Sequence, residues 1–118
     1  MSNRDRKIEA QIQRALSELV SREVKDPRVG NVTITAVAVT PDLKLARVFF
    51  VPFASSHPVE EVRAGLTHAA RFLRGQLGRR LALRYAPRLE FVFDDSLDQA
   101  ERLTHLIDSA VAGEHKPG

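Results

Sequence analysis

The sequence has no cysteine, no tryptophan and a single tyrosine, Tyr85, among its 118 residues. The absence of cysteine excludes disulfide bonds, thiolate zinc sites and thiol nucleophiles. It also fits a protein of a reducing compartment. Because so few large aromatic rings are available, any binding to nucleic acid should depend on phosphate and shape more than on base stacking.

Long apolar runs are also missing. The N-terminal residues MSNRDRKIEAQ lack the apolar core of a signal peptide, and no run approaches the roughly 18 apolar residues of a membrane span. With 43% hydrophobic and 28% charged residues, the composition is typical of a folded globular protein. We therefore expect a cytoplasmic monomer, with one domain at residues 1–112 and a flexible tail at residues 113–118.

Acidic residues are absent between Glu61 and Glu90, although the whole chain has a net charge of only +3. From residue 71 onward this acid-free segment is rich in arginine: Arg71, Arg74, Arg79, Arg80, Arg84 and Arg88. A local positive field of this kind indicates a polyanionic partner. The alternative is a solvated arginine-rich helix face, paired with acids from elsewhere in the fold.

Apolar spacing predicts an α+β fold in which helices pack on a small sheet. Helices are expected at residues 4–24, at 59–68, directly afterwards in the arginine-rich stretch, and from Leu97 to about residue 111. The expected strands are residues 32–39, 45–51 and 89–93, of which the first two form an antiparallel hairpin. One core should contain Ile12, Ile34, Val48, Leu73, Leu77 and Phe91.

Local signals predict how these elements begin, end and turn. Asp26 and Pro27 should end the first helix in a turn. One of the residues 55–57 should cap the helix that has Pro58 in its first turn. Because Leu45, Phe49 and Val51 alternate with Ala46, Val48 and Phe50, both faces of the hairpin are expected to be largely apolar.

Two stretches resemble the bacterial ribosome-binding factor A family. The first is REVKDPRVG at residues 22–30, at the junction of the first helix and first strand. The second runs from Phe72 to Leu97 and includes FLR, LG, LR and DDSL in the family's order. The resemblance covers about residues 5–111. It implies a KH domain of the second type (α-β-β-α-α-β, plus a C-terminal helix) with a three-stranded sheet.

The resemblance also implies a function. Members of this family bind the immature small (30S) ribosomal subunit and its 16S ribosomal RNA, assist late processing and maturation, support growth in the cold, and are not enzymes. Their helix–helix corner faces RNA and usually reads alanine, any residue, glycine. Here Ala69 and Ala70 match that corner, but Arg71 replaces the glycine.

The candidate RNA contacts follow from charge and from this resemblance together. The guanidinium group of arginine suits phosphate, and several arginines on one helix can follow a backbone. The candidates are Arg71, Arg74, Arg79, Arg80 and Arg84, with Lys25 and Arg28 at the first helix–strand junction. An alternative function is a protein-interaction module that docks on a ribosomal protein or an enzyme.

Other motifs favour structural roles. A G-x-x-G pattern at residues 75–78 resembles the clamp of KH domains, but Leu77 falls on the apolar stripe of a helix. We therefore expect Gly75 to allow close helix–strand packing and Gly78 to lie at a helix end.

Catalytic and metal sites are not indicated. Asp94, Asp95 and His105 would be needed for a small hydrolase, but a strand exit and helix caps explain the acids more simply. The four histidines lack metal-ligand spacing, so we expect no metal, cofactor or small-molecule substrate.

Overall fold

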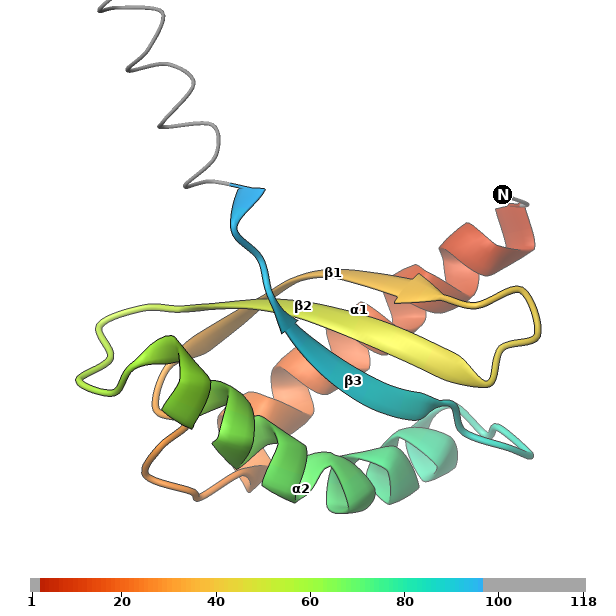
Figure 1. Cartoon of the computed structure of the whole chain (residues 1–118). Helices are drawn as coiled ribbons and strands as arrows, with labels where there is room; N and C mark the ends of the chain where they lie inside the picture. The colour runs from red at the N-terminus through yellow and green to blue at the C-terminus, as the bar shows by residue number, and fades with distance from the viewer. Residues whose placement is uncertain (1–2, 97–118) are drawn as a thin grey trace, which may run out of the picture.

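A computed structural model describes residues 3–96 of the chain (Figure 1). Its elements are, in order, α1 (Asn3–Glu23), β1 (Val32–Val39), β2 (Leu45–Pro52), α2 (Val59–Arg80) and β3 (Arg88–Phe93). The predicted C-terminal helix and tail, with His105, lie outside the described residues. Neither α1 nor α2 has an apolar stretch of the length that crossing a bilayer requires.

The three strands form one sheet in the order β1-β2-β3. β1 and β2 pair antiparallel, which confirms the predicted hairpin, and β2 and β3 pair parallel. Parallel neighbours need a crossover connection, and α2 supplies it. The register of β1 against β2 shifts between Ile34 and Ala36, where Thr35 forms an irregularity at the edge of the sheet.

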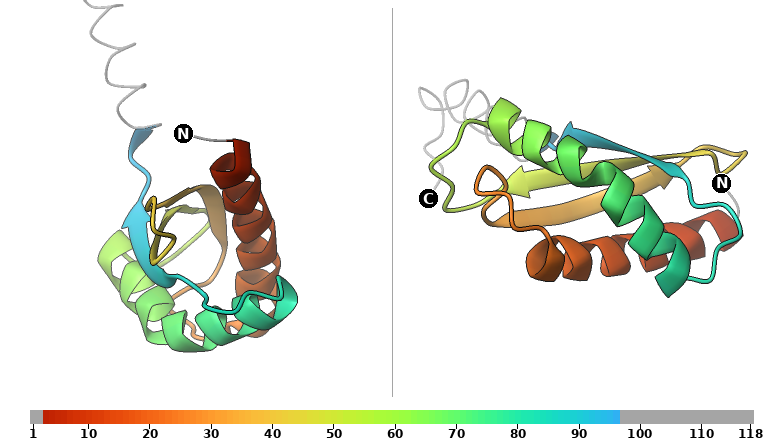
Figure 2. Two further views of the ribbon diagram at one scale, coloured as in Figure 1. Left: turned by 90° about the vertical axis from the view of Figure 1, so that its right-hand side faces the viewer. Right: turned by 90° about the horizontal axis from the view of Figure 1, so that it is seen from below.

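Both helices cover the same face of the sheet (Figures 1 and 2). The strands present alternate residues to that face, so Ala46, Val48 and Phe50 of β2 are completely buried. The predicted core is confirmed, because all six of its members belong to one buried cluster: Ile12, Ile34, Val48, Leu73, Leu77 and Phe91.

The opposite face of the sheet carries no helix in the described part of the chain. Phe49 and Val51 of β2 are half-buried there, and Arg47 lies 3.5 Å from Glu90 of β3 in an ion pair. The prediction of two largely apolar faces is therefore confirmed, with one ion pair across the open face.

The predicted pair of central helices is wrong, because α2 is a single helix from Val59 to Arg80. The expected corner at Ala69 and Ala70 lies inside it, and both residues are partly buried against the core. Alanine and arginine are strong helix formers, and with Arg71 in place of the family's glycine nothing in the stretch favours a break. The axis of α2 still changes direction about midway, so the corner has become a bend (Figures 1 and 2).

The predicted cap of this helix is also wrong. Pro58 itself is the N-cap residue, with extended backbone angles, and no side chain caps the helix. The Ser55 hydroxyl instead accepts a hydrogen bond from the His57 N–H at 3.1 Å. The His57 Nδ1 lies 2.8 Å from a carboxylate oxygen of Glu61 in the first turn. A negative charge there is stabilised by the positive end of the helix dipole.

Candidate nucleic-acid interface

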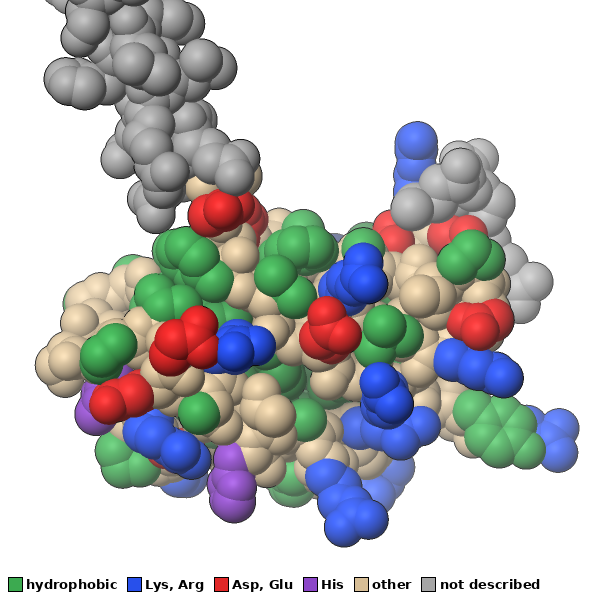
Figure 3. Space-filling model, viewed as in Figure 1, with side chains coloured by type: hydrophobic (Ala, Val, Ile, Leu, Met, Phe, Trp, Pro, Cys, Tyr) green, Lys and Arg blue, Asp and Glu red, His purple; other side chains and the backbone are tan. Residues whose placement is uncertain are grey.

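Four exposed arginines, Arg71, Arg74, Arg79 and Arg84, form what we call the basic surface. The first three project from the C-terminal half of α2, and Arg84 follows in the loop to β3. They line a shallow depression of about 630 Å³ together with Gly75, Gly78, Leu83, Tyr85 and Ala86. In Figure 3 the Lys and Arg side chains gather over this region, at the lower right of the molecule.

Helix periodicity places the basic surface opposite the core. Leu73 and Leu77 of α2 are completely buried, whereas Arg71 and Arg74, three residues apart, are neighbours on the exposed side. Leucines and arginines that each recur at helical spacing therefore give α2 one apolar face and one positive face.

The end of α2 fixes the position of the loop beside these arginines. Leu83 N–H donates to the Gly78 carbonyl at 2.9 Å, and Ala82 adopts a left-handed backbone with φ of 52°. Arg74 Nε then donates to the Ala86 carbonyl at 3.0 Å, which ties the loop back to the helix. Part of the guanidinium of Arg74 is thus used to hold the loop in place.

Acidic neighbours neutralise only one of the predicted RNA-contacting arginines on α2. Arg80 Nη1 lies 2.8 Å from the Glu18 carboxylate of α1. Within residues 3–96, Arg71, Arg74, Arg79 and Arg84 make no salt bridge. The alternative of a solvated arginine paired with an acid from elsewhere in the fold therefore applies to Arg80. The positive charges of the basic surface are not neutralised by a salt bridge within residues 3–96.

The other two predicted contacts, Lys25 and Arg28, lie elsewhere, in the turn between α1 and β1. Asp26 organises this turn: its carboxylate accepts the Arg28 backbone N–H at 2.9 Å and Arg28 Nη2 at 2.6 Å. The predicted turn role of Asp26 is confirmed. The guanidinium of Arg28 is largely committed to this intramolecular pair, and Lys25 is exposed.

The hydrogen bonds from the Arg28 side chain and backbone lower the pKa of Asp26 to about 2. The same pair raises the pKa of Arg28. The turn sits against the N-terminal half of α2 at Gly65, where an added Cβ would lie only 2.8 Å from Val29 Cγ2. Lys25 and Arg28 thus belong to the turn that packs on the first half of α2, whereas the basic surface belongs to the second half.

The G-x-x-G pattern is not a clamp in this structure, because residues 75–78 are helical and Leu77 is completely buried. The expected packing role of Gly75 is wrong: an added Cβ would meet only the end of the Arg79 side chain, at 4.0 Å. Gly78 lies in the last turn of α2, as expected, and a Cβ there would touch Ala86 at an ordinary 3.5 Å.

Asp94, the first residue after β3, makes hydrogen bonds on both sides of the strand's end. Asp94 accepts the Thr35 hydroxyl at 2.5 Å and the Ser96 backbone N–H at 2.9 Å. These hydrogen bonds, first those from Ser96 and Thr35, lower the pKa of Asp94. Among residues 3–96 no group of three or more histidine, aspartate or glutamate side chains could hold a metal ion. The carboxylate of Asp94 links Thr35, at the register shift of β1, to the end of β3.

Tyr85 also lines the depression of the basic surface, although the sequence analysis did not include it among the candidate contacts. Its side chain is 80% exposed, and the Arg84 guanidinium carbon lies 5.5 Å from the centre of its ring. The signal in the sequence was its position between Arg84 and Arg88 in a loop, since an aromatic residue among arginines is common in surfaces that bind nucleic acid.

The family assignment rests on nearly the whole chain. Residues 4–107 match the family described as ribosome-binding factor A. The chain belongs to this family. The ribosome-binding factor A of Thioalkalivibrio sulfidiphilus is 46% identical over 110 residues, which are 93% of this chain and 85% of that protein. The ribosome-binding factor A of Nitrosomonas europaea is 45% identical over 89% of this chain and 90% of its own.

Solved structures of ribosome-binding factor A share the fold. The crystal structure of the Thermus thermophilus protein has a TM-score of 0.69 and 34% identity, covering 75% of this chain and 93% of its own. A homology model of the Thermus thermophilus ribosome-binding factor A, fitted into a cryo-EM map of its complex with the 30S subunit, has a TM-score of 0.63 and 32% identity, over 75% of this chain and 93% of its own. The predicted α+β, KH-type fold with a three-stranded sheet is confirmed, with the two central helices joined into α2.

Proposed function

We propose that this protein binds the immature small ribosomal subunit through 16S ribosomal RNA and assists its late maturation. The observation that carries the proposal is the basic surface, whose four arginines have no acidic partner within residues 3–96. Family membership supports it, as does the fitting of a relative into a 30S complex. RNA is the polyanion of the small subunit, and arginine binds its phosphates well.

The mechanism is binding, not catalysis. The basic surface contacts phosphates of one RNA arrangement and stabilises it relative to others, by an amount set by the difference in affinity. When the mature arrangement forms, the phosphates no longer match the arginines and the protein leaves. Assistance to late rRNA processing, and to growth in the cold, where misfolded RNA arrangements persist longer, follows from this preference. The protein acts as a monomer in the cytoplasm.

Docking on a ribosomal protein or an enzyme is the alternative. The open face of the sheet favours it, because Phe49, Val51 and Val92 are apolar and only half-buried there. An apolar contact of this kind would change little with salt, whereas a phosphate contact weakens steeply as salt rises.

Sedimentation of cell extracts tests the proposed function. We expect the protein to sediment with free small subunits and not with complete ribosomes. Cells that lack it should accumulate precursor small-subunit RNA, and more so in the cold. Equal association with free subunits and complete ribosomes, or with neither, would contradict a role in maturation of the small subunit.

A further inference from the structure

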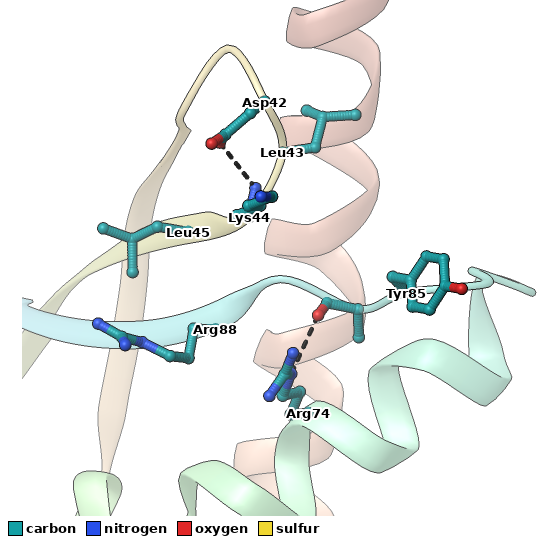
Figure 4. Close-up of a pocket in the computed structure, with 8 residues that line it drawn as sticks. Asp42, Leu43, Lys44, Leu45, Arg74, Tyr85 and Arg88 are labelled. Carbon is teal, nitrogen blue, oxygen red and sulfur yellow. Dashed lines mark hydrogen bonds between the residues drawn. The ribbon is translucent and has the colours of Figure 1, made fainter.

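A second groove lies next to the basic surface, between the β1–β2 turn and the loop from α2 to β3. It encloses about 780 Å³ and is drawn in Figure 4. The residues that line it come from three separate parts of the chain: Asp42, Leu43, Lys44, Leu45, Arg74, Tyr85, Ala86 and Arg88.

Two hydrogen bonds fix the walls of the groove. Arg88 N–H donates to the Lys44 carbonyl at 2.8 Å, where β2 and β3 begin side by side. The Arg74 side chain reaches the Ala86 carbonyl from α2, as the dashed line in Figure 4 shows. The turn and the loop that form the groove are therefore each held by a hydrogen bond, the turn to β3 and the loop to α2.

Positive charge dominates the groove. Lys44, Arg74 and Arg88 contribute three cations, and none of them makes a salt bridge within residues 3–96. Asp42 is the acid of the lining, and its carboxylate already accepts the Thr40 hydroxyl at 2.7 Å and the Lys44 backbone N–H at 3.1 Å. An anionic ligand would thus meet three cations and one carboxylate, and that carboxylate is already hydrogen-bonded within the β1–β2 turn.

Apolar side chains stand beside these cations. The ring of Tyr85 is 80% exposed, and Leu43 is 37% exposed with a left-handed φ of 60°. A left-handed backbone is unfavourable for leucine, and in such turns glycine or asparagine is the usual choice. Arg84 lies over one face of the Tyr85 ring, so the exposed remainder of the ring is available to a second flat group.

We propose that this groove binds an unpaired nucleotide of RNA, with the base stacked on Tyr85 and the flanking phosphates held by Lys44, Arg74 and Arg88. A flat base fits an exposed ring, and phosphates fit the three cations. A base in a duplex is already stacked and cannot reach the ring, so the groove selects single-stranded RNA. This inference rests on the proposed function and adds one specific base contact to a surface otherwise expected to read phosphates.

The chain provides its own probe for the stack. Tyr85 is the sole tyrosine and there is no tryptophan, so tyrosine emission reports on this ring alone. We expect a short oligouridylate to quench that emission in a saturable way. An RNA duplex should bind without quenching, and uridine monophosphate should quench only at much higher concentration, which separates an RNA site from a site for free nucleotides.

Substitutions test the groove with fluorescently labelled oligouridylate. Tyr85→Ala should weaken binding by about 5- to 150-fold, the range typical of one stacked base, whereas Tyr85→Phe should keep the affinity. Arg88→Ala should shift the midpoint of the tyrosine quench to higher RNA concentration. The matched control is Phe53→Ala, which removes a ring that is 52% exposed and lies outside the groove.

The outcomes distinguish this inference from the proposed function. If Tyr85→Ala binds oligouridylate as the unsubstituted protein does while Arg71→Ala with Arg79→Ala weakens binding, the nucleotide site is wrong and the basic surface stands. If the unsubstituted protein binds neither oligouridylate nor small-subunit RNA, both are wrong. Because Tyr85 is exposed, a circular dichroism melt should show Tyr85→Ala folded as before.

Discussion

Gly65 and Gly75 lie on the same helix but in opposite surroundings. Gly65 is buried where the turn after α1 crosses α2, and an added Cβ would lie 2.8 Å from Val29 Cγ2 and 3.3 Å from Arg28 Cβ. Gly75 faces outward, with only the tip of Arg79 within reach. The first glycine permits close packing, whereas the second only weakens the helix.

Alanine at the two positions should therefore change stability in opposite directions. We expect Gly65→Ala to destabilise the fold by about 1–3 kcal/mol through overpacking. Gly75→Ala should stabilise it by about 0.5–1 kcal/mol, because alanine favours the helix. Urea denaturation measures both, and each variant is the control for the other. A loss of stability at Gly75 would show that this position has a packing or loop role after all.

Asp26 should make stability depend on acid pH. Its pKa of about 2 lies below the value of about 3.9 for an unfolded aspartate, so its stabilising effect is complete above that higher value and is lost as the pH falls toward 2. Asp26→Asn should be less stable than the unsubstituted protein at neutral pH, and the difference should shrink between pH about 4 and about 2. Denaturation midpoints across that range measure it; a constant difference would mean that the ion pair with Arg28 does not form in solution.

At the scale of elements, the strands follow from sequence more closely than α2 does. β1 begins at Val32 and ends at Val39, the bounds that its content of β-branched residues predicts, whereas the register shift at Thr35 has no signal in the sequence. Two apolar patterns with almost no linker between them, together with the family's pattern, predict a corner in α2, but the helix propensity of alanine and arginine at residues 69–71 keeps the helix continuous.

The candidate site was only partly predictable from the chain. Clustering of arginines on α2 follows from helical spacing, whereas the pairing of Arg80 with Glu18 joins residues of two helices that only tertiary packing brings together. For the same reason the groove could not be foreseen, because it needs the β1–β2 turn placed beside Arg88 and Tyr85.

The two sides of α2 should respond differently to truncation. Leu77 is completely buried among the core residues, so Leu77→Ala should cost about 2–5 kcal/mol. Phe72, on the same helix, is 45% exposed, and Phe72→Ala should cost much less. Chemical denaturation compares the two. Similar costs for both would mean that α2 is rotated about its axis relative to the sheet.

At the scale of the whole molecule, several cations without a salt bridge adjoin one another on the C-terminal half of α2 and the loop after it. Arg47, Arg63 and Arg80 are each paired with a glutamate, at Glu90, Glu60 and Glu18. The cations of the basic surface and of the groove beside it make no salt bridge within residues 3–96. The two sites adjoin, because Arg74 and Tyr85 line both. The C-terminal half of α2 and the loop after it thus form one continuous positively charged region, which we propose as the RNA-binding surface.

The most direct test of this region is the salt dependence of binding to small-subunit RNA. The test protein is Arg71→Ala with Arg79→Ala, and the control is Arg47→Ala with Arg63→Ala, which removes the same charge from exposed, paired positions. We expect the test protein to bind more weakly and the slope of log affinity against log salt to shrink by about 0.7–0.9 per lost phosphate contact, while the control keeps nearly the original affinity and slope. Equal slopes for both double variants would contradict phosphate binding by the basic surface and would move the RNA contact to another face of the molecule.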